Sequence, residues 1–468
     1  MPVNPAIFRE YDIRGLAEFD LSDDHVQTIA VGLARWYQAK GVKTILLAHD
    51  CRLSSPRILE VLRRILIACG FDLVIIGHSS TPCFYHACFT LNSDAGVMIT
   101  ASHNPAPDNG LKLMLSRDAL FGAQIQEVYQ EVAAYEAQGE PPLPAVTPGM
   151  VTMVEHTSAY IADLLGRITL GPRHLKVVID CGNGSVGPFA ELVLDSLKDK
   201  ISYTALNFTP DGTFPVHEAD PVKPKNLVDI QRLVLEQGAD IGIGFDGDGD
   251  RIGVVNDKAE ILWGDQLMIL FWREIMAKHP NSLGLVEVKC SQVLYDEIAR
   301  LGGRPDYCRT GHSLIKARMK EENALFAGEM SGHLFFADEY YGFDDALYAA
   351  LRLLRILSFE ERSLSEMMAD LPKMSITPEV RFASPDNVKF ELVAKLSAEL
   401  AKKHPVITID GVRVLFPEGW GLFRASNTQP AIVARCEAST AEKLKEYTQE
   451  LNELYLRLQP GSEPIKWE

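Results

Sequence analysis

Three aspartates within a span of five residues form the strongest chemical signal in the chain. Asp246, Asp248 and Asp250 alternate with glycines in FDGDGDR (245–251), directly after the apolar stretch ADIGIGF (239–245). Glycines let the backbone fold so that the carboxylates converge, and converging carboxylates repel one another unless a hard divalent cation such as Mg²⁺ or Ca²⁺ lies among them. The other interpretation is an acidic surface turn. The apolar strands expected on both sides favour a metal site at the carboxyl end of a strand.

Two common motifs share parts of this pattern but do not fit it. An EF-hand loop also has aspartates at its first, third and fifth positions, but its sixth residue is glycine, and here it is Arg251. Gly242, Gly244 and Gly247 spell the dinucleotide-binding pattern G-x-G-x-x-G, yet they begin inside an expected strand and lead into carboxylates that would repel a pyrophosphate. We therefore expect neither an EF-hand nor a nicotinamide cofactor.

A serine loop gives the second signal. In TASHNP (100–105), Ser102 follows an apolar stretch, and Pro105 restricts the backbone so that the hydroxyl is presented on a loop rather than in a helix. His103 and Lys112 add a base or a cation nearby in the sequence. A plain turn is the alternative, and neighbouring positions in a sequence do not establish a Ser-His-Asp triad.

Two later loops carry groups suited to sugars and to phosphate. GEMSGH (328–333) supplies hydrogen-bond donors and acceptors for a ligand rich in hydroxyls, from Glu329, Ser331 and His333. RASNTQP (424–430) offers a guanidinium, hydroxyls, an amide and loop N–H groups, which suit a phosphate dianion. The side chains concerned are Arg424, Ser426, Asn427 and Thr428. Each loop alone is also compatible with an ordinary surface turn.

Alternating helices and strands must position these loops. In the first third, apolar strands lie between amphipathic helices, which indicates a mostly parallel sheet covered on both faces. The expected elements are helices at 23–40 and 55–69 and strands at 44–49, 72–77 and 95–100. The alternation restarts at 176 and near 263, whereas the residues after Pro372 favour an α+β unit with antiparallel strands. The proline-rich segment 140–149 is a predicted linker.

Length and charge restrict the class of protein. The 468 residues suggest about three domains at roughly 150 residues each, with room for a small fourth one. Forty-six Lys+Arg against 63 Asp+Glu give a net charge of −17, which argues against a nucleic-acid partner. No apolar run is long enough to span a membrane, and the charged residues near the N-terminus do not fit a signal peptide. We expect a cytoplasmic protein without a membrane partner.

The eight cysteines do not indicate a disulfide scaffold or a redox pair. They are sparse for a chain of this length, and none forms a Cys-x-x-Cys pair. Cys83, His86 and Cys88 form one local cluster, but their spacing fits no common zinc site. Cys69, Cys181, Cys290 and Cys436 lie at or near apolar runs, and we expect them to be small buried hydrophobic residues.

Together, the motifs resemble those of the α-D-phosphohexomutase superfamily, most closely its bacterial phosphomannomutase/phosphoglucomutase branch. The resemblance covers nearly the whole chain, with the motifs in the right order and spacing. The segments that carry it are FREYDIRG (8–15), TASHNP (100–105), CGNG (181–184), DGDGDR (246–251), RTGHS (309–313), GEMSGH (328–333), YGFDD (341–345) and GWGLFRASNTQP (419–430).

The resemblance implies an architecture. It consists of three related mixed α/β domains and a C-terminal α+β domain, heart-shaped around a central cleft, with one motif from each domain in the cleft. We expect the domains at 1–155, 156–256, 257–370 and 371–468. In this order they would carry the phosphoserine loop, the metal-binding loop, the sugar-recognition loop and the phosphate-binding loop. A hinge near 368–374 would let the fourth domain serve two binding modes.

The resemblance also implies roles for individual residues. Ser102 would carry the phosphoryl group and ligate Mg²⁺ together with the three aspartates. Glu329 and Ser331 would read the sugar hydroxyls, and the four polar residues at 424–428 would bind the phosphate that is not reacting. Further positions expected at the substrate are Tyr11, Arg14, Lys112, Arg251, Lys289, His312 and His333. Candidates for the general acid and base are His103, Lys112, Arg14 and His333, and the sequence does not rank them.

The implied activity is that of an isomerase acting by intramolecular phosphoryl transfer. Phospho-Ser102 would give its phosphoryl group to the free hydroxyl of a hexose phosphate, and the 1,6-bisphosphate would reorient and return its other phosphoryl group. Such transfer needs in-line positioning and charge stabilisation, which a metal ion and several cations provide. We expect interconversion of the 1- and 6-phosphates of mannose, glucose or both, activation by hexose 1,6-bisphosphate, and a monomer or small homo-oligomer.

Some features leave alternatives open. Asp108 precedes Asn109-Gly110 where family members often have an aromatic residue, which leaves the packing of this loop open. Met330 within GEMSGH goes with glucose and mannose phosphates in the family, whereas a glutamine would have suggested glucosamine phosphate. The alternatives are a phosphoglucosamine mutase, a metal-assisted serine phosphatase that releases inorganic phosphate, and a non-catalytic sensor of sugar phosphates.

Overall fold

A computed structural model describes residues 2–139, 141, 143, 146–426 and 430–467. The chain divides into two compact units, each assembled from two stretches of sequence. Unit 1 consists of Met1–Leu267 and Ser331–Met367, and unit 2 of Met268–Met330 and Met368–Glu468. The predicted linker 140–149 lies in unit 1, and part of it falls outside the described residues.

The first sheet of unit 1 is mixed rather than mostly parallel. Its strands, in spatial order, are β1 (Ile13–Leu16), β5 (Asp108–Leu115), β4 (Ala95–Ile99), β2 (Thr44–His49), β3 (Asp72–His78) and β7 (Val151–Met153), and β6 (Asp118–Ala119) pairs with β5. β4, β2, β3 and β7 run parallel, whereas β5 is antiparallel to both β1 and β4. The reversal has a simple cause: the short loop 100–107, which contains Ser102, connects β4 directly to β5, and short connections join antiparallel strands.

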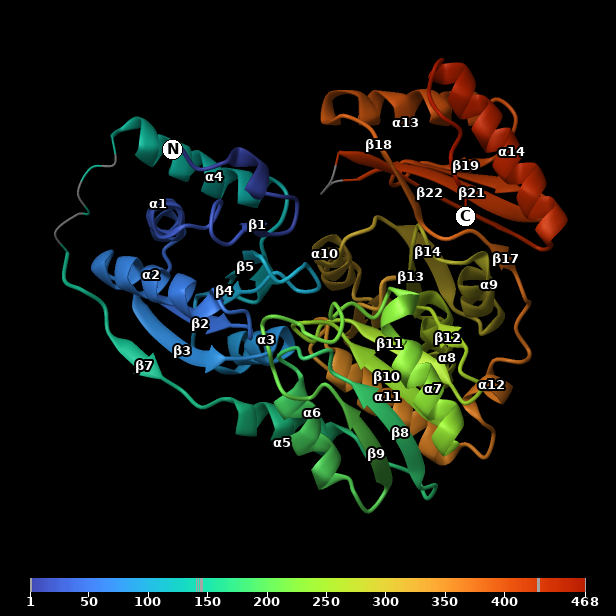
Figure 1. Ribbon diagram of the computed structural model, residues 1–468, viewed down its shortest axis with the longest axis horizontal. Helices are drawn as coiled ribbons and strands as arrows, with labels where there is room; N and C mark the ends of the chain where they lie inside the picture. The colour runs from blue at the N-terminus through green and yellow to red at the C-terminus, as the bar shows by residue number, and fades with distance from the viewer. Residues whose placement is uncertain (1, 140, 142, 144–145, 427–429, 468) are drawn as a thin grey trace. The chain divides into compact units, whose positions relative to one another are not determined.

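Helices cover both faces of this sheet (Figure 1). They are η1 (Pro5–Ile7), α1 (Asp23–Ala39), α2 (Ser55–Ala68), α3 (Thr81–Thr90) and α4 (Ala123–Ala137). Because side chains alternate between the faces of a strand, Ile45 and Val97 pack in the core formed with α1, α2 and α4. Gly96 faces the other way, where a Cβ atom would lie 2.8 Å from the Phe84 ring of α3.

Unit 1 also contains a second, smaller sheet. Its strand order is β12 (Ile261–Leu262), β11 (Ile252–Asn256), β10 (Ile241–Phe245), β8 (Leu175–Asp180) and β9 (Ile201–Leu206). β8 is parallel to β9 and β10, and β11 is antiparallel to β10. Its helices and the remaining elements of this part are α5 (Thr157–Arg167), α6 (Gly187–Ser196), η2 (Pro224–Asn226), α7 (Val228–Gln237), β16 (Leu334–Phe336), α11 (Ala346–Phe359) and α12 (Leu364–Met367). The α7 residues Ile230 and Val234 pack on Val178 and Val255 of the sheet.

The first part of unit 2 is an α/β layer. β13 (Leu283–Glu287) pairs in parallel with β14 (Arg304–Cys308) and with β15 (Phe326–Gly328). Helices α9 (Gln292–Arg300) and α10 (His312–Glu322) connect these strands, and α8 (Gly264–Lys278) enters the unit from Leu267. Parallel neighbours need such crossover connections, because the chain must return to the starting edge before each new strand.

The second part of unit 2 is an antiparallel sheet with two helices. Its strands are β17 (Ser375–Ile376), β22 (Ala431–Ala438), β21 (Gly419–Ala425), β20 (Val412–Phe416) and β19 (Val406–Ile407), and β18 (Val380–Ala383) pairs with β22. Helices α13 (Asp386–Leu400) and α14 (Ala441–Leu458) pack on one face through Leu396 and Leu451. Trp420 and Leu422 lie in a separate cluster with Val288, directly after β13, so both parts of unit 2 share buried surface.

The structure confirms the expected fold class of three α/β domains and a C-terminal α+β domain with antiparallel strands. Cys69, Cys181, Cys290 and Cys436 are buried free thiols, as the sequence predicts. Among the described residues, no helix combines the length and the apolar character that crossing a bilayer requires.

Candidate active site

The loop between β10 and β11 folds around the side chain of its first aspartate. Asp246 Oδ1 accepts hydrogen bonds from the backbone N–H groups of Gly249, Asp250 and Arg251, at 3.0, 3.0 and 3.1 Å. Gly249 has φ +80°, a conformation that glycine adopts without strain. All three aspartates of the loop are buried. The short hairpin therefore holds its carboxylates away from bulk water, and the acidic surface turn is excluded.

Ser102 lies against this loop. Its Oγ donates a hydrogen bond to Asp246 Oδ2 at 2.8 Å, although the two residues belong to different sheets. The approach requires a glycine at position 247, because a Cβ atom there would lie 2.6 Å from the Ser102 carbonyl oxygen. Ser102 itself has φ +51°, which is strained for a residue other than glycine. Such strain persists only where the surroundings over-determine the conformation.

Lys112 on β5 partly balances the buried negative charge. Its Nζ lies 2.9 Å from Asp248 Oδ2 and also contacts Asp250 Oδ2. Burial lowers the pKa of Lys112, but the two carboxylates outweigh burial and raise this pKa well above its usual value. Thr81 Oγ1 donates to Asp248 Oδ2 at 2.6 Å. Lys112 is therefore held as a cation.

The three aspartates fit a divalent cation. One carboxylate oxygen from each aspartate lies within 4.8 Å of the other two. Asp248 Oδ1 and Asp250 Oδ1 are buried and have no hydrogen-bond partner within the described part of the chain. Burial, with Asp250 and Asp248 nearby, raises the pKa of Asp246 well above its usual value. Excess buried negative charge and unsatisfied oxygen ligands are what a hard cation would relieve.

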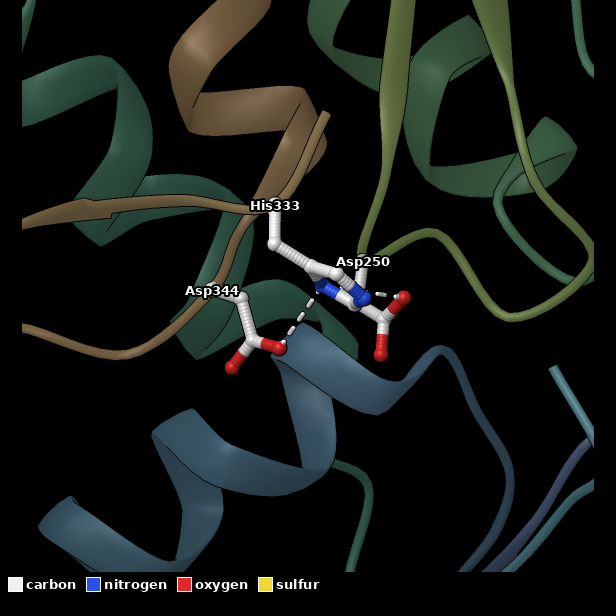
Figure 2. A group of neighbouring side chains, drawn as sticks. All are labelled: Asp250, His333 and Asp344. Carbon is white, nitrogen blue, oxygen red and sulfur yellow. Dashed lines mark ion pairs between the residues drawn. The ribbon is translucent and has the colours of Figure 1, made fainter. Parts of the chain in front are cut away.

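His333 and Arg251 adjoin the cluster. Arg251 Nε donates to His333 Nε2 at 2.9 Å. The other ring nitrogen, Nδ1, lies 3.1 Å from Asp344 Oδ2 and 3.6 Å from Asp250 Oδ1, as Figure 2 shows. Asp344 belongs to the YGFDD motif, but sequence reasoning did not single it out as a site residue. His333 is therefore enclosed by a guanidinium on one side and two carboxylates on the other.

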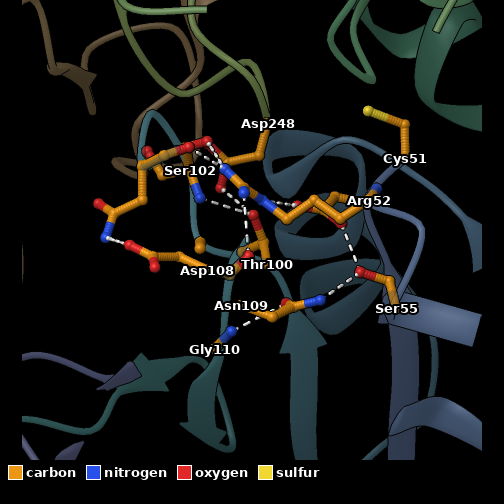
Figure 3. Close-up of polar contacts among 12 residues, drawn as sticks. Cys51, Arg52, Ser55, Thr100, Ser102, Asp108, Asn109, Gly110 and Asp248 are labelled. Atoms are coloured by element: carbon orange, nitrogen blue, oxygen red, sulfur yellow. Dashed lines mark hydrogen bonds and ion pairs between the residues drawn. The ribbon is translucent and has the colours of Figure 1, made fainter. Parts of the chain in front are cut away.

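A fully buried arginine organises the serine loop (Figure 3). Arg52 donates to the backbone oxygens of Ser102 (2.8 Å), Asn104 (2.6 Å), Pro105 (2.7 Å) and Asp108 (3.0 Å). Its Nε also pairs with Asp50 Oδ2 at 3.1 Å. A planar guanidinium with donors in fixed directions can hold several carbonyls at once. No local signal in the sequence identifies Arg52, because its partners lie about 50 residues further along the chain.

Arg14 and Asp108 tie the outer side of the same loop. Arg14 Nη1 donates to Asn104 Oδ1 at 2.8 Å and to the Ala101 carbonyl at 3.2 Å. The Asn104 amide in turn donates to Asp108 Oδ2 at 2.8 Å. Asp108, the residue that departs from the family pattern, is therefore held in this loop by its hydrogen bond with Asn104.

His103 lies next to the serine hydroxyl and is half-buried. Its Nδ1 is 3.1 Å from Ser102 Oγ. Burial and the nearby charges of Arg251 and Arg14 lower the pKa of His103 well below its usual value. The imidazole is therefore neutral at physiological pH.

In unit 2, two buried glutamates connect the predicted sugar loop with the segment before α10. Glu329 Oε1 accepts the Gly311 N–H at 2.8 Å, and His312 follows as the first residue of α10. Glu287, at the end of β13, accepts the Met330 N–H at 3.0 Å and the Thr310 hydroxyl at 2.8 Å. Sequence reasoning missed Glu287, which lies inside an apolar strand pattern without any polar neighbour.

Lys289 lies beside the same glutamate. Its Nζ is 3.3 Å from Glu287 Oε1 and 3.0 Å from Glu379 Oε2. Burial lowers the pKa of Lys289, but the glutamates outweigh burial and raise it above its usual value. Burial raises the pKa of Glu379, but Lys289 and Arg381 outweigh burial and lower this pKa to about 2.

Arg424 and Ser426 lie at the end of β21, before the predicted phosphate loop. Arg424 Nε pairs with Asp410 Oδ2 at 3.0 Å, and the same oxygen accepts the Thr310 N–H at 3.1 Å. The buried Lys389 of α13 donates to the Ser426 carbonyl. Asn427 and Thr428, which the sequence also assigns to this loop, lie outside the described residues.

Within unit 1, the structure brings together most of its predicted site residues. They are Arg14, Ser102, His103, Lys112, Asp246, Asp248, Asp250, Arg251 and His333. Tyr11 lies half-buried just before β1, and Ser331 lies half-buried just before β16. Within unit 2, Lys289, Glu329 and Arg424 gather around the loops that follow β13, β15 and β21, and His312 begins the adjacent helix.

Comparison with known proteins supports the same assignment along the whole chain. Models of phosphoglucomutase/phosphomannomutase alpha/beta/alpha domains I, II and III match residues 5–139, 158–259 and 263–374. The model of the C-terminal domain of the same family matches residues 379–454.

Individual relatives agree with these matches. The chain is 38% identical over 446 residues to a Pseudomonas aeruginosa protein named phosphomannomutase/phosphoglucomutase, covering 95% of this chain and 94% of that protein. It is 41% identical over 439 residues to a phosphoglucomutase of Neisseria meningitidis, covering 93% of each. A solved phosphoglucomutase/phosphomannomutase family protein of Burkholderia thailandensis superimposes with a TM-score of 0.91 at 35% identity, covering 99% of this chain and 100% of that one. The chain belongs to the phosphoglucomutase/phosphomannomutase family and is a hexose phosphate mutase.

Proposed function

We propose that this enzyme interconverts the 1- and 6-phosphates of glucose and mannose, with Ser102 as the residue that carries the transferred phosphoryl group. The main support for this proposal is the 2.8 Å hydrogen bond from Ser102 Oγ to Asp246 Oδ2, which holds the hydroxyl next to a buried cluster of carboxylates. The names of the Pseudomonas and Neisseria relatives support both sugars.

The side chains of unit 1 would carry out the transfer. Asp246, Asp248, Asp250 and Ser102 would hold Mg²⁺, which when bound supplies positive charge at the transferring phosphoryl group. Lys112 keeps its proton because its pKa is raised, so we assign it to charge stabilisation. Arg14 does not give up a proton in proteins and has the same role. His103 lies nearest to the hydroxyl, and we assign to it the proton exchange at Ser102 Oγ.

The loops of unit 2 would bind the rest of the substrate. We assign recognition of the sugar hydroxyls to Glu329, together with Ser331 of unit 1. The phosphate that is not reacting is assigned to Arg424, Ser426, Asn427 and Thr428, and the remaining substrate contacts to Tyr11, Arg251, Lys289 and His312. The functional domains would span 1–155, 156–256, 257–370 and 371–468, with a hinge near 368–374.

The reaction balances as two transfers. The O–P bond at Ser102 breaks and the serine oxygen takes up a proton, while a new O–P bond forms at the free hydroxyl of the hexose phosphate, whose proton passes to a base. The resulting 1,6-bisphosphate reorients, and the O–P bond at its other phosphate breaks as a new bond forms at Ser102 Oγ. The serine proton passes to a base, the released sugar oxygen takes up a proton, and the phosphoenzyme is restored.

A parallel assay tests the reaction and its sugar. Purified protein with Mg²⁺ is given glucose 1-phosphate, mannose 1-phosphate or glucosamine 1-phosphate, with and without glucose 1,6-bisphosphate, and isomer formation and phosphate release are both measured. We expect isomers of glucose and mannose phosphates at comparable rates, stimulated by the bisphosphate. Predominant phosphate release would support the serine phosphatase and overturn the proposal, and clear preference for glucosamine phosphate would support the phosphoglucosamine mutase.

A serine variant tests the carrier. We expect Ser102→Ala to lower kcat by at least about 10³-fold, since no covalent carrier remains, while calorimetry still detects binding of the sugar phosphate. Ser116→Ala is the matched control, because Ser116 also has a positive φ but lies exposed in the turn after β5. Full activity of Ser102→Ala would show that another residue carries the phosphoryl group.

A further inference from the structure

One row of residues across the antiparallel sheet of unit 2 faces the segment that carries Lys289. Arg413 on β20, Leu422 on β21 and Arg435 on β22 lie directly opposite one another in the strand register, so their side chains share one face of the sheet. Leu422 packs there against Val288, which directly follows β13. The row therefore contacts the α/β layer of the same unit.

Arg413 binds the two carbonyl groups on either side of Lys289. Its Nη1 donates to the Val288 oxygen at 2.7 Å and to the Cys290 oxygen at 2.8 Å. From the next strand but one, Arg435 Nη1 donates to the Lys289 oxygen at 2.5 Å. Two guanidinium groups, whose donors point in fixed directions, therefore hold three consecutive carbonyls of the main chain.

The surroundings of Arg413 are unusual for a charged side chain. It is fully buried, and its guanidinium lies 3.6 Å from the centre of the Trp420 ring and 4.8 Å from that of Tyr307. Its remaining hydrogen bond goes to the Gln292 side chain at 3.3 Å. Within the described part of the chain Arg413 forms no ion pair, whereas Lys289 forms two. An apolar side chain would fill such a place at lower cost, so packing alone does not explain the arginine.

We propose that Arg413 is a positioning residue that acts through the main chain on Lys289. It fixes the backbone of Lys289, whose ammonium is then directed by Glu287 and Glu379. Because β20 pairs with β21, which carries Arg424, the same bonds set the spacing between Lys289 and Arg424. Two cations that bind one phosphorylated sugar act together only while their spacing is kept. The inference rests on the proposed function for the role of Lys289, but the contacts of Arg413 with the carbonyls do not depend on that function.

Two neighbouring residues of β20 provide the variant and its matched control. Arg413→Lys keeps a positive charge but cannot donate to both carbonyls in the fixed directions of a guanidinium. Val414→Ala changes the next residue, which is fully buried on the opposite face, in the core formed with α13 and α14. Both variants weaken the packing of the same strand, but only Arg413→Lys releases the carbonyls beside Lys289.

Hydrogen exchange measures the effect on the main chain without reference to activity. The Val288 N–H donates to the Cys308 oxygen at 3.0 Å, and the Cys290 N–H donates to the Glu287 oxygen at 2.9 Å. In the full-length protein, Arg413→Lys should speed exchange at 288–290 by about tenfold, because this segment opens more readily. Val414→Ala should speed exchange in α13 and α14 and change it at 288–290 by less than about twofold.

Steady-state kinetics with glucose 1-phosphate test the link to Lys289. Arg413→Lys should raise KM by about tenfold and change kcat by less than about threefold, whereas Val414→Ala should leave both constants unchanged. Lys289→Met should raise KM further. If Arg413 acts through Lys289, the double variant should have the KM of Lys289→Met alone, because the positioned group is already gone.

Three results would overturn the inference: unchanged exchange at 288–290 in Arg413→Lys, an equal rise of KM in Val414→Ala, or KM effects of Arg413→Lys and Lys289→Met that multiply in the double variant. If Arg413→Lys does not fold, Arg413→Met, which removes the buried charge, decides by the same criteria. If the wild type fails to isomerise sugar phosphates, the proposed function fails, while hydrogen exchange still decides whether Arg413 holds the main chain at Lys289.

Discussion

The two units hold charged side chains in opposite ways. In unit 1, the cluster around Ser102 contains the carboxylates of Asp246, Asp248 and Asp250, and Lys112 is the cation in direct contact with it. In unit 2, the buried cations Lys289 and Arg424 each already have carboxylate partners: Glu287 and Glu379 for Lys289, and Asp410 for Arg424. Unit 1 therefore has surplus negative charge, whereas the cations of unit 2 are balanced.

This difference fits the proposed assignment of phosphoryl transfer to unit 1 and of substrate binding to unit 2. Surplus buried carboxylates are costly unless a cation joins them, so unit 1 is prepared to receive a metal ion. A cation held by a carboxylate keeps its position and its proton, so unit 2 is prepared to present fixed positive groups to an anion. We expect damage to unit 1 to lower kcat, and damage to unit 2 to raise KM.

The largest effect is expected from the carboxylates of unit 1. Asp248→Asn should lower kcat by about 10²- to 10³-fold. Losing one carboxylate weakens the binding of a metal ion that stabilises the transferring phosphoryl group by several kcal/mol. Steady-state kinetics across Mg²⁺ concentrations provide the measurement, and EDTA should abolish the wild-type activity.

Asp180→Asn is the control for this prediction. Asp180 is a buried aspartate at the end of β8 in the same sheet, but it pairs with His217. If both variants lose activity equally, the cluster has no special role and the difference between the units disappears.

The second effect concerns the arginine beneath the serine loop. Arg52→Lys cannot bond to four carbonyls at once, so Ser102 should shift, and kcat should fall by about 10- to 100-fold. Stability should fall by about 3 kcal/mol, since a buried charge loses partners. Urea unfolding and kinetics on the same samples measure both quantities.

Arg57→Lys is its control. Arg57 also donates to backbone carbonyls, at Ala17 and Leu21, but it is partly exposed, and its own hydrogen bonds in the described structure do not reach the serine loop. We expect a change in stability within about 1 kcal/mol and unchanged kcat. Normal kcat in Arg52→Lys would mean that the loop does not depend on the buried guanidinium.

A smaller effect is expected in unit 2. Arg424→Ala removes a charge-assisted contact worth about 1.5–3 kcal/mol, so KM should rise by about 10- to 100-fold with kcat changed much less. Arg457→Ala, on the exposed side of α14, should leave both constants unchanged. A fall in kcat without a rise in KM would assign Arg424 to the phosphoryl transfer. It would contradict the separation of catalysis in unit 1 from substrate binding in unit 2.

The smallest effect appears only in acid. Glu379 has its pKa lowered from 4.5 to about 2, so it stabilises unit 2 above pH 4.5, and this contribution is lost as the pH falls from 4.5 towards 2. The shift corresponds to about 3 kcal/mol at most. Hydrogen exchange of unit 2 in wild type and Glu379→Gln should therefore differ at pH 6 and converge near pH 2. An equal difference at both values would contradict the assigned pKa.

Unit 1 should respond to acid at higher pH. Burial and the neighbouring His86 lower the pKa of His156 from 6.5 to about 4. A histidine with a lowered pKa stabilises the fold above 6.5, and this contribution is lost as the pH falls from 6.5 to 4. Protection of α3 and α5 in unit 1 should weaken in that range, before the Glu379 contribution to unit 2 is affected.

Much of the fold follows from local patterns. The helix from Asp23, the strand at 44–49 and the antiparallel strands near the C-terminus all form where their periodicity predicts them. Neither the strand β5 nor its antiparallel pairing was predicted, and apolar periodicity alone does not show in which direction a strand pairs. The glycine-flanked aspartates and the serine could also be found from the sequence, since their residue types and spacing are themselves the chemical signal.

By itself, the sequence identified the residues to which the chemistry is assigned, because Asp246, Asp248, Asp250 and Ser102 stand in short motifs whose residue types and spacing are the signal. Tertiary structure alone decided which residues support them. Arg52 reaches Ser102 and Asp344 reaches His333 only through folding, and Glu287 looks like any residue of a buried strand. The physical reason is that a motif is a property of neighbouring positions, whereas support depends on hydrogen bonds between segments that only packing brings together.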